Sequence, residues 1–270
     1  MTTPRVFVFD LDGVLYRGTD PVEGAAETLA ALRQRPGVSL FFLTNNSTQD
    51  RSDYVEKLTR FGMPCTEDEV ITSAFATAMY LAAGPGAEGK VALAVGGHGI
   101  RNELARVGIT VRRPEEMEVE GERIDYVVVG LDRDFNYHAL LRAQQAILGG
   151  ATFIATNRDG QFPAEGGTVT PGAGAVVAAI QACTGVVPDV IGKPETLGLK
   201  TILDRAKARP EEAVMIGDRC DTDVLCGNRL GVPTVLVLTG VTTEAQALAA
   251  PPEQQPGRIL ATLRELIQAS

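Results

Sequence analysis

The segment Asp10-Leu11-Asp12-Gly13 places two carboxylates one residue apart, directly after a short apolar run, Val6–Phe9. Such a run is typical of a buried strand, and in parallel α/β sheets ligands bind at the carboxyl ends of the strands. Two carboxylates at that place are costly to desolvate unless a cation or a proton compensates their charge. The pattern therefore predicts a site in which Asp10 binds a metal ion and attacks a substrate, while Asp12 moves a proton.

Neutral hydrogen-bond donors and one cation follow in two other segments. The apolar run Val38–Leu43 is expected to be a second strand, and three polar residues come directly after it: Thr44, Asn45 and Asn46. We expect them at the same edge of the sheet as Asp10, where hydroxyl and amide groups can hold phosphate oxygens. Lys193 stands alone between a glycine and a proline, and its charge could offset the attacking carboxylate and the phosphoryl oxygens. These residue types indicate phosphoryl transfer.

A third apolar run, Val214–Ile216, also leads into carboxylates. Three of them lie within six positions of the chain: Asp218, Asp221 and Asp223. So many negative charges need counter-charge, and Mg²⁺ is the natural candidate because it prefers oxygen ligands and keeps bound waters. Asp221 has a second interpretation, in which it bonds loop amides or a neighbouring arginine.

These runs belong to an alternation of strands and helices that extends over most of the chain. Continuous apolar strands between helices indicate a parallel sheet covered on both faces. A Gly/Pro cluster at residues 84–86 marks a linker, after which a second series includes a strand over Tyr126–Val129 and a helix over Tyr137–Leu148. A last helix is expected over Gly257–Ala269. The sequence predicts an α/β fold: a discontinuous, doubly wound, parallel-sheet, Rossmann-like core, residues 1–80 plus 186–270, with a second α/β domain, residues 81–185, inserted into it.

Composition and charge limit the classes of protein. Apolar residues make up 44% of the 270 residues, which is enough for a core and argues against disorder. A formal net charge of −9 disfavours nucleic acid and an anionic membrane surface as partners. No apolar stretch reaches the roughly 18 residues of a membrane span, and no leader precedes Val6–Phe9, so we expect a cytoplasmic protein. The four cysteines lack metal-binding spacing, which predicts reduced, non-catalytic thiols.

Together these segments resemble the haloacid dehalogenase-like hydrolase superfamily, and within it the branch of p-nitrophenylphosphatase, NagD-type, phosphoglycolate and pyridoxal phosphate phosphatases. Four motifs carry the resemblance, in the family's order and over nearly the whole chain: residues 10–18, 44–47, 193–194 and 217–223. Residues 157–159 and 171–174 are also similar to the cap segment of that branch. The resemblance implies that residues 81–185 form a cap that covers the site and contacts the substrate. It also implies that homodimers formed through the cap are common.

The resemblance further implies a Mg²⁺-dependent phosphatase of small phosphorylated metabolites. Asp10 would attack phosphorus to form an aspartyl-phosphate, and Asp12 would protonate the leaving oxygen and then deprotonate the hydrolytic water. Lys193 would offset the charge of the phosphoryl group. The ligands of Mg²⁺ would be the carboxylates of Asp10 and Asp218, the backbone carbonyl of Asp12, and Asp223 through a water molecule.

Substrate contacts are implied for both parts of the chain. Thr44 and Asn45, with Asn46 beside them, would hold the phosphoryl group. In the cap we expect a specificity loop over Asn157–Pro163, with three substrate-binding residues: Asn157, Arg158 and Phe162. Phe162 stands where pyridoxal phosphate phosphatases place a histidine and phosphoglycolate phosphatases an aliphatic residue. This departure weakens a pyridoxal phosphate assignment, and we hypothesise that Phe162 meets the leaving group.

Two other functions stay open at this point. The same residues would serve a phosphotransferase or mutase in which a sugar hydroxyl intercepts the aspartyl-phosphate, and an isomerised product in place of free phosphate would distinguish it. A non-catalytic sensor of phosphate ligands belongs to a different class, and the complete set of catalytic residues argues against it.

Overall fold

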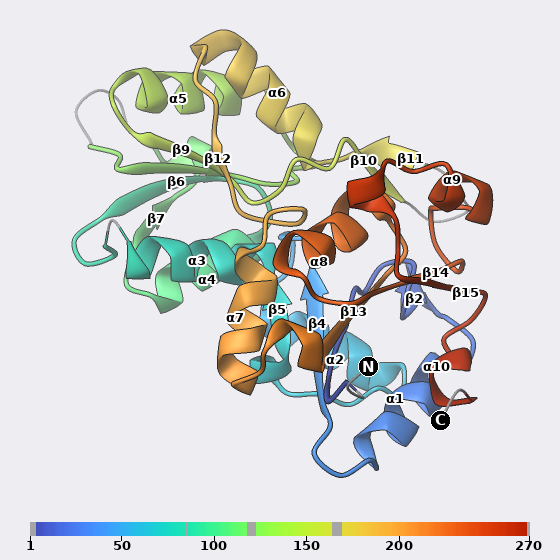
Figure 1. Ribbon diagram of the computed structural model, residues 1–270. Coiled ribbons are helices and arrows are strands. Elements are labelled where there is room, and N and C mark those ends of the chain that lie inside the picture. The colour runs from blue at the N-terminus through green and yellow to red at the C-terminus, as the bar shows by residue number, and fades with distance from the viewer. Residues whose placement is uncertain (1–3, 85, 118–122, 164–168, 269–270) are drawn as a thin grey trace. The chain divides into compact units, whose positions relative to one another are not determined.

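The computed structural model describes four stretches of the chain (Figure 1): residues 4–84, 86–117, 123–163 and 169–268. Contacts divide the chain into two compact units. The first unit contains Met1–Thr44, Ser52–Ile71 and Lys193–Ser270, and the second contains Asn45–Arg51 and Thr72–Gly192. Each unit is built on a parallel sheet, which confirms the predicted α/β class, a Rossmann-like core with a second α/β domain inserted.

Among the described residues, the sheet of the first unit has six strands in the order β15-β14-β13-β1-β4-β5. The strands are β1 (Val6–Phe9), β4 (Ser39–Thr44), β5 (Val70–Thr72), β13 (Ala213–Gly217), β14 (Thr234–Val237) and β15 (Arg258–Leu260). The chain adds β4 and β5 on one side of β1, and later adds the other three strands on the opposite side. The strand order therefore reverses between β1 and β13. The carboxyl ends of strands at such a switch point frame a ligand site.

Helices cover both faces of this sheet. Its described helices are α1 (Ala25–Arg33), α2 (Arg51–Arg60), α7 (Leu197–Ala206), α8 (Leu225–Leu230), α9 (Glu244–Leu248) and α10 (Glu265–Gln268). On one face, Leu29 of α1 and Leu58 of α2 pack in a single apolar core with Phe9 of β1. Successive residues of a strand point to opposite faces of the sheet. On the face opposite to α1 and α2, Gly198 of α7 lies against Leu43 of β4. Burial on both faces explains why these strands are continuously apolar.

In its described part, the second unit has a five-stranded sheet in the order β12-β9-β8-β6-β7. The strands are β6 (Val91–Val95), β7 (Thr110–Arg112), β8 (Tyr126–Val129), β9 (Thr152–Ala155) and β12 (Asp189–Val190). The helices are α3 (Ser73–Ala83), α4 (His98–Arg106), α5 (Tyr137–Leu148) and α6 (Ala173–Thr184). Ile147 of α5 and Val177 of α6 pack in one core with Val127 and Phe153, so these two helices cover the same face of the sheet. Helix α3 packs beside α4 (Figure 1).

Two short antiparallel hairpins complete the described strands. The first, β2 (Tyr16–Arg17) with β3 (Asp20–Pro21), follows the Asp10–Gly13 segment almost directly. The second, β10 (Gln161–Pro163) with β11 (Val169–Pro171), contains the end of the predicted specificity loop. Both hairpins thus belong to segments that the sequence singled out for function.

The prediction of one helix over Gly257–Ala269 is wrong for the residues that the structure describes. A strand, β15, occupies Arg258–Leu260, and helix α10 begins only at Glu265. Apolar residues of this segment recur at helical spacing, but β14 offers an edge with which Leu260 pairs in register, opposite Val237. Pairing with an existing sheet outweighs the local spacing of apolar residues.

The predicted domain boundaries, with residues 1–80 plus 186–270 as a catalytic core and 81–185 as a cap, stay a proposal. The compact units place residues 45–51, 72–80 and 186–192 in the second unit. Contacts within that unit explain this: α3 packs on α4, and the Arg51 guanidinium pairs with the buried Glu103 carboxylate at 3.0 Å.

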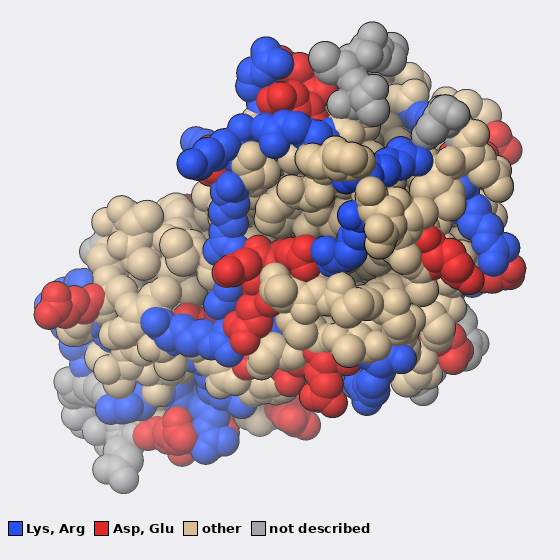
Figure 2. Space-filling view, turned by 90° about the horizontal axis from the view of Figure 1, so that it is seen from below, with Lys and Arg blue, Asp and Glu red and all other residues tan. Residues whose placement is uncertain are grey.

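Charged side chains of both signs are interspersed over the face shown in Figure 2. The described residues include exposed ion pairs, such as Arg209 with Glu211 at 3.1 Å. Exposed pairs of this kind contribute only about 0–1 kcal/mol each, so the apolar cores carry most of the stability.

Within the described residues, no helix has both the length and the apolar character that a membrane crossing requires.

Candidate active site

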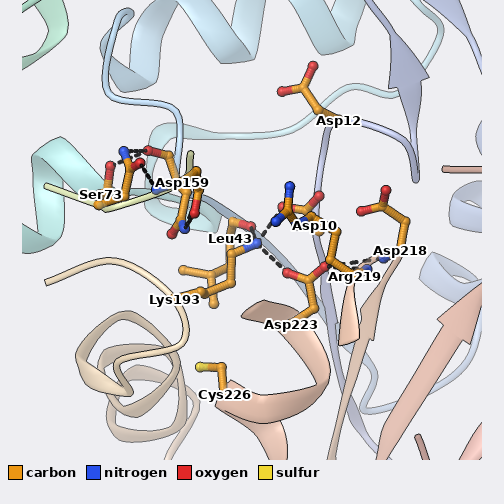
Figure 3. A network of polar contacts seen from close by, with 12 residues as sticks. Asp10, Asp12, Leu43, Ser73, Asp159, Lys193, Asp218, Arg219, Asp223 and Cys226 are labelled. Atoms are coloured by element: carbon orange, nitrogen blue, oxygen red, sulfur yellow. Dashed lines mark hydrogen bonds and ion pairs between the residues drawn. The ribbon is translucent and has the colours of Figure 1, made fainter. Parts of the chain in front are cut away.

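Lys193 lies in a buried ion-pair network at the carboxyl ends of β1 and β4 (Figure 3). Its Nζ is 2.5 Å from Asp10 Oδ1 and 2.6 Å from Asp223 Oδ1, and it donates to the Leu43 carbonyl at 3.1 Å. Only 4% of Lys193 and 1% of Asp223 is exposed. The structure therefore brings together the predicted nucleophile, the predicted cation and a predicted metal ligand, although Asp10 and Lys193 are 183 positions apart in the sequence.

A third carboxylate belongs to this group. Asp10, Asp218 and Asp223 each offer a carboxylate oxygen within 4.8 Å of the other two. In the described part of the chain, this network holds one ammonium, that of Lys193, so two negative charges need a further partner when all three carboxylates are ionised. One divalent cation balances them, and buried carboxylate oxygens suit Mg²⁺. The donor set therefore fits the predicted cofactor.

Backbone contacts fix the first two carboxylates at the ends of their strands. The Asp10 N–H donates to the Ile216 carbonyl at 2.8 Å, so Asp10 continues the pairing of β1 with β13. Asp218 follows the last residue of β13, and its Oδ2 accepts the Val241 N–H at 2.8 Å. Gly13 has a φ of +85°, and a Cβ there would lie 2.5 Å from Asp218 Oδ2. A glycine is therefore needed where the loop after β1 passes the Asp218 carboxylate.

Asp223 is positioned by a single turn of π-helix, Cys220–Val224, a form that is frequent at functional sites. Its Oδ2 accepts the N–H groups of Asp218 and Arg219 at 3.2 and 3.1 Å, while its Oδ1 faces Lys193. Asp221, in the same turn, is exposed and pairs with the Arg219 guanidinium at 2.7 Å. Its second interpretation, as the partner of a neighbouring arginine, therefore agrees with the structure.

Burial and charge act together on the pKa values of these groups. Burial raises the pKa of Asp10, and the Lys193 ammonium opposes that rise. Burial lowers the pKa of Lys193, but the carboxylates of Asp10 and Asp223 outweigh it, so its pKa is raised and the ammonium stays charged. Burial, with repulsion from Asp223, raises the pKa of Asp218 to about 7. The network thus holds an extra proton near neutral pH until a cation replaces it.

We expect the affinity for Mg²⁺ to rise with pH below about 7. A metal ion needs the ionised Asp218, and below this pKa binding must release a proton, so the Kd should change about tenfold per pH unit. Isothermal titration calorimetry in buffers of different ionisation enthalpy measures both the affinity and the proton release. Asp221→Asn, a change in the same loop, should keep the same slope. An affinity independent of pH below about 7 would contradict the assignment of Asp218.

The raised pKa of Asp218 also affects the stability of the metal-free protein, which should fall as pH rises. Asp218 has its pKa raised above the unfolded value near 4, so between about pH 4 and 7 the folded state holds a proton that the unfolded chain has lost. The contribution of Asp218 to the free energy of unfolding therefore falls as pH rises through that window. Mg²⁺ should offset this loss, which thermal unfolding with Mg²⁺ and with EDTA would show.

The Asp12 side chain points away from the Lys193 network (Figure 3). Its Oδ2 accepts a long hydrogen bond, 3.4 Å, from the Tyr16 hydroxyl, and the Lys57 ammonium lies 3.6 Å from the centre of the Tyr16 ring. Burial raises the pKa of Asp12, and the Lys57 charge opposes the rise. A carboxyl group that keeps its proton more readily than usual suits proton donation. Sequence reasoning missed Tyr16 and Lys57, whose contact depends on how the β2–β3 hairpin folds over α2.

Thr44 is the last residue of β4, the strand that pairs with β1 in register, Phe42 opposite Phe9. Its side chain is buried and hydrogen-bonded to the fully buried Tyr54. Thr44 therefore lies at the carboxyl end of the neighbouring strand, where its place in the sequence predicts it.

Asn45 follows Thr44 in the chain and makes its described contacts within the second unit. Its main-chain carbonyl accepts hydrogen bonds from Ser73 Oγ at 2.6 Å and Asn157 Nδ2 at 2.7 Å. Its Nδ2 donates to both carboxylate oxygens of Asp159, at 3.2 and 3.1 Å. Ser73 had no predicted role, and Asp159 was predicted only as part of the specificity loop, because contacts across 28 and 114 positions leave no local signal in the sequence.

The other predicted substrate contacts take part in local interactions. Asn46 Oδ1 accepts the N–H and the hydroxyl of Thr48 at 3.0 and 2.7 Å, which forms a side-chain turn. Arg158 is exposed and donates to Gln181 at 3.0 Å. The backbone of Phe162 lies in β10, and its side chain lies outside the described residues.

Two family models match the chain. A model described as "Haloacid dehalogenase-like hydrolase" matches residues 7–110, and a second, HAD-hydrolase-like model matches residues 190–266. The first range contains Asp10 and Asp12, and the second contains Lys193, Asp218 and Asp223.

Curated proteins and solved structures resemble the chain over nearly its whole length. It is 37% identical over 251 residues to the acid sugar phosphatase of Staphylococcus epidermidis, which covers 92% of both chains. A glycerol phosphate phosphatase from Mycobacterium tuberculosis, solved in complex with magnesium, has 35% identity and a TM-score of 0.88 over 98% of this chain and 77% of that chain. The p-nitrophenyl phosphatase from Archaeoglobus fulgidus has 32% identity and a TM-score of 0.87 over both whole chains. NagD from Escherichia coli has 32% identity and a TM-score of 0.85 over 98% of each chain.

Proposed function

The chain belongs to the haloacid dehalogenase-like hydrolase family, in the branch of NagD and the p-nitrophenylphosphatases, and we propose that it is a Mg²⁺-dependent phosphatase of small phosphorylated metabolites. The observation that carries this proposal is the buried Lys193 between Asp10 and Asp223, with Asp218 beside them. Relatives named for sugar phosphate and glycerol phosphate support phosphate esters of small, hydroxyl-rich alcohols as the substrate class.

Asp10 is the proposed nucleophile of the first step. One carboxylate oxygen forms a bond to phosphorus while the bond between phosphorus and the ester oxygen breaks. Asp12 gives its proton to the leaving oxygen, so this step yields a free alcohol and an aspartyl-phosphate on Asp10. The ammonium of Lys193 supports this role because it attracts the charge of both the nucleophile and the phosphoryl oxygens.

Asp12 serves again in the second step. Now ionised, it accepts a proton from a water molecule whose oxygen attacks phosphorus, and the bond between phosphorus and the Asp10 oxygen breaks. This releases inorganic phosphate and restores both carboxyl groups. The raised pKa of Asp12 supports its role in the first step, where it must carry a proton when the substrate arrives.

Mg²⁺, when bound, would offset the negative charge on the phosphoryl oxygens. Its proposed ligands are the carboxylates of Asp10 and Asp218 and the backbone carbonyl of Asp12. Asp223 already accepts hydrogen bonds from Lys193 at one oxygen and from two backbone N–H groups at the other. These contacts support the expected role of Asp223 as a ligand through water.

We assign phosphate binding to Thr44 and Asn45, with Asn46 beside them. The place of Thr44 at the end of β4 supports its role. For the cap, the predicted substrate contacts of Asn157 and Arg158 stay proposals. The Asn157 amide donates a hydrogen bond to the Asn45 carbonyl. This contact favours a role of Asn157 in holding the phosphate-binding segment over a direct contact with the leaving group.

Phe162→Ala is expected to change which substrates are preferred. An aromatic ring beside the leaving group would favour large or apolar alcohols, so its removal should shift relative kcat/KM between p-nitrophenyl phosphate and glycerol phosphate by about tenfold. The neighbouring exposed residue of β10, replaced in Gln161→Ala, serves as the control. If Phe162→Ala leaves the relative kcat/KM values of a substrate panel unchanged, Phe162 does not meet the leaving group.

Three further assignments complete the proposal. Residues 1–80 plus 186–270 act as the catalytic core and residues 81–185 as the cap. The protein works in the cytoplasm and forms homodimers through the cap, on which Tyr137 and Leu148 are exposed apolar residues. Light scattering of the purified protein, compared with a variant charged at both positions, tests the dimer.

Phosphate release across a panel of phosphate monoesters tests the function. The panel contains sugar phosphates, glycerol phosphate, phosphoglycolate, pyridoxal phosphate, nucleotides and p-nitrophenyl phosphate, each measured with Mg²⁺ and with EDTA. Turnover that requires Mg²⁺ would establish the phosphatase, and the substrate with the highest kcat/KM would narrow its role. An isomerised product without free phosphate would favour the phosphotransferase, and binding without turnover would favour the sensor.

A further inference from the structure

We propose that Asp159 is a positioning residue for phosphoryl transfer, which acts by fixing the conformation of Asn45. The inference rests on the proposed role of Asn45 in phosphate binding. It assigns a function to Asp159, a residue of the cap motif at 157–159 to which the proposed mechanism gives no role.

The Asp159 carboxylate sets the orientation of the Asn45 side chain. Both carboxylate oxygens lie within hydrogen-bond distance of Asn45 Nδ2, at 3.2 and 3.1 Å. Because a carboxylate accepts but does not donate, the amide nitrogen must face Asp159 and the amide oxygen must face away. In this proposal the side-chain amide therefore holds the residue in place, and the main-chain N–H of Asn45 is the donor to the phosphate. Hydrogen bonds to a charged acceptor are stronger than those between neutral groups, so this orientation is strongly preferred over the flipped one.

The main chain of Asn45 is held from the same side. Its carbonyl accepts from Ser73 Oγ at 2.6 Å and from Asn157 Nδ2 at 2.7 Å. The carbonyl and the side-chain amide are thus both fixed, by α3 and by the segment after β9. We call Ser73, Asn157 and Asp159 the Asn45 clamp. All three clamp residues lie in the second unit with Asn45, and Ser73, Asn157 and Asn45 are buried.

Asp159 is itself held in place by its own segment. Its N–H donates to Asn157 Oδ1 at 3.1 Å, and its carbonyl accepts the Gly174 N–H at 2.9 Å. A Cβ at Gly174 would lie 2.5 Å from the Arg158 carbonyl oxygen, so only a glycine allows the start of α6 to approach this closely. The glycines of the 171–174 segment therefore seat the loop that carries Asp159. Packing and hydrogen bonds within the chain thus hold each clamp residue, which is what precise placement of a phosphate-binding group requires.

A double-mutant cycle separates action through Asn45 from a general structural effect. We expect Asp159→Ala to lower kcat/KM about 10- to 100-fold, as loss of a supporting hydrogen-bond partner does at other sites, and to weaken inhibition by inorganic phosphate in parallel. Asp159→Asn keeps one acceptor oxygen and should retain more activity than Asp159→Ala. In an Asn45→Ala background, Asp159→Ala should have almost no further effect, because the side-chain amide through which Asp159 acts is gone.

Each outcome decides between the proposals. Equal losses from Asp159→Ala in both backgrounds would overturn action through Asn45 and leave a structural role. If Asp159→Ala fails to fold, the same comparison is made with Asp159→Asn. Asp134→Ala, which removes an exposed carboxylate of the same unit, is the control and should change neither constant. An inactive wild-type protein would overturn the proposed function and this role with it, whereas additive losses in an active enzyme overturn the role of Asp159 alone.

Discussion

Asp10→Asn is expected to lower kcat at least about 10⁴-fold, with the protein still folded. The substitution keeps the size of the side chain but replaces a carboxylate oxygen with a neutral amide, which cannot form the aspartyl-phosphate. It also removes one of three neighbouring carboxylates that exceed the charge of Lys193. Burial already raises the pKa of Asp10, so its charge is costly in the metal-free state. We therefore expect a melting temperature with EDTA that is equal to or higher than that of the wild-type protein.

Asp221→Asn is the matched control for this experiment. It makes the same chemical change in the acidic loop, but Asp221 is exposed and pairs with Arg219 outside the carboxylate group. Phosphate release and thermal unfolding are measured for both variants with Mg²⁺ and with EDTA. Activity that survives in Asp10→Asn, or that falls equally in both variants, would reject covalent catalysis by Asp10.

Much of the fold could be predicted because its strands are buried on both faces. The strand over Tyr126–Val129 and the helix over Tyr137–Leu148 are confirmed at both ends. The helix has clear boundaries, since the Asn136 side chain accepts the N–H groups of its first turn and Gly149 follows its last residue. The C-terminal segment was predicted wrongly because strand β15 exists only through pairing with β14, a contact that no local pattern reports.

For the site, too, the residues at strand ends could be predicted and the contacts made by loops could not. Asp10, Thr44 and Asp218 could be placed together because each stands at the end of an apolar strand, and parallel strands of one sheet end at one edge. The contacts of loops could not be predicted. One such contact is that of Asp223 with Lys193, which depends on the π-helical turn. Another is that of the Asp159 carboxylate with Asn45. Both depend on loop geometry, which the spacing of residues in the sequence does not determine.

Lys193→Met is expected to damage stability and activity together. The side chain of methionine fills a similar volume, but Asp10 and Asp223 then face each other in a buried site without the ammonium that contacts both. Removing one partner of a buried ion pair costs about 3–5 kcal/mol, and we expect a loss of that order in the free energy of unfolding with EDTA. Without a cation to balance the phosphoryl oxygens, kcat should fall at least about 10²-fold.

The pH and metal dependence of this loss identify its cause. Without Lys193, the pKa of Asp10 should lie further above its unfolded value, because burial raises it and the ammonium of the wild-type protein opposes that rise. The loss of stability should therefore be small near pH 4, where Asp10 is protonated, and grow as pH rises toward neutrality. Mg²⁺ should reduce it, since the ion supplies counter-charge to the same carboxylates. Denaturant unfolding of Lys193→Met, with the exposed Lys200→Met as control, measures this. A loss that neither pH nor Mg²⁺ changes would show that Lys193 acts through packing and not through its charge.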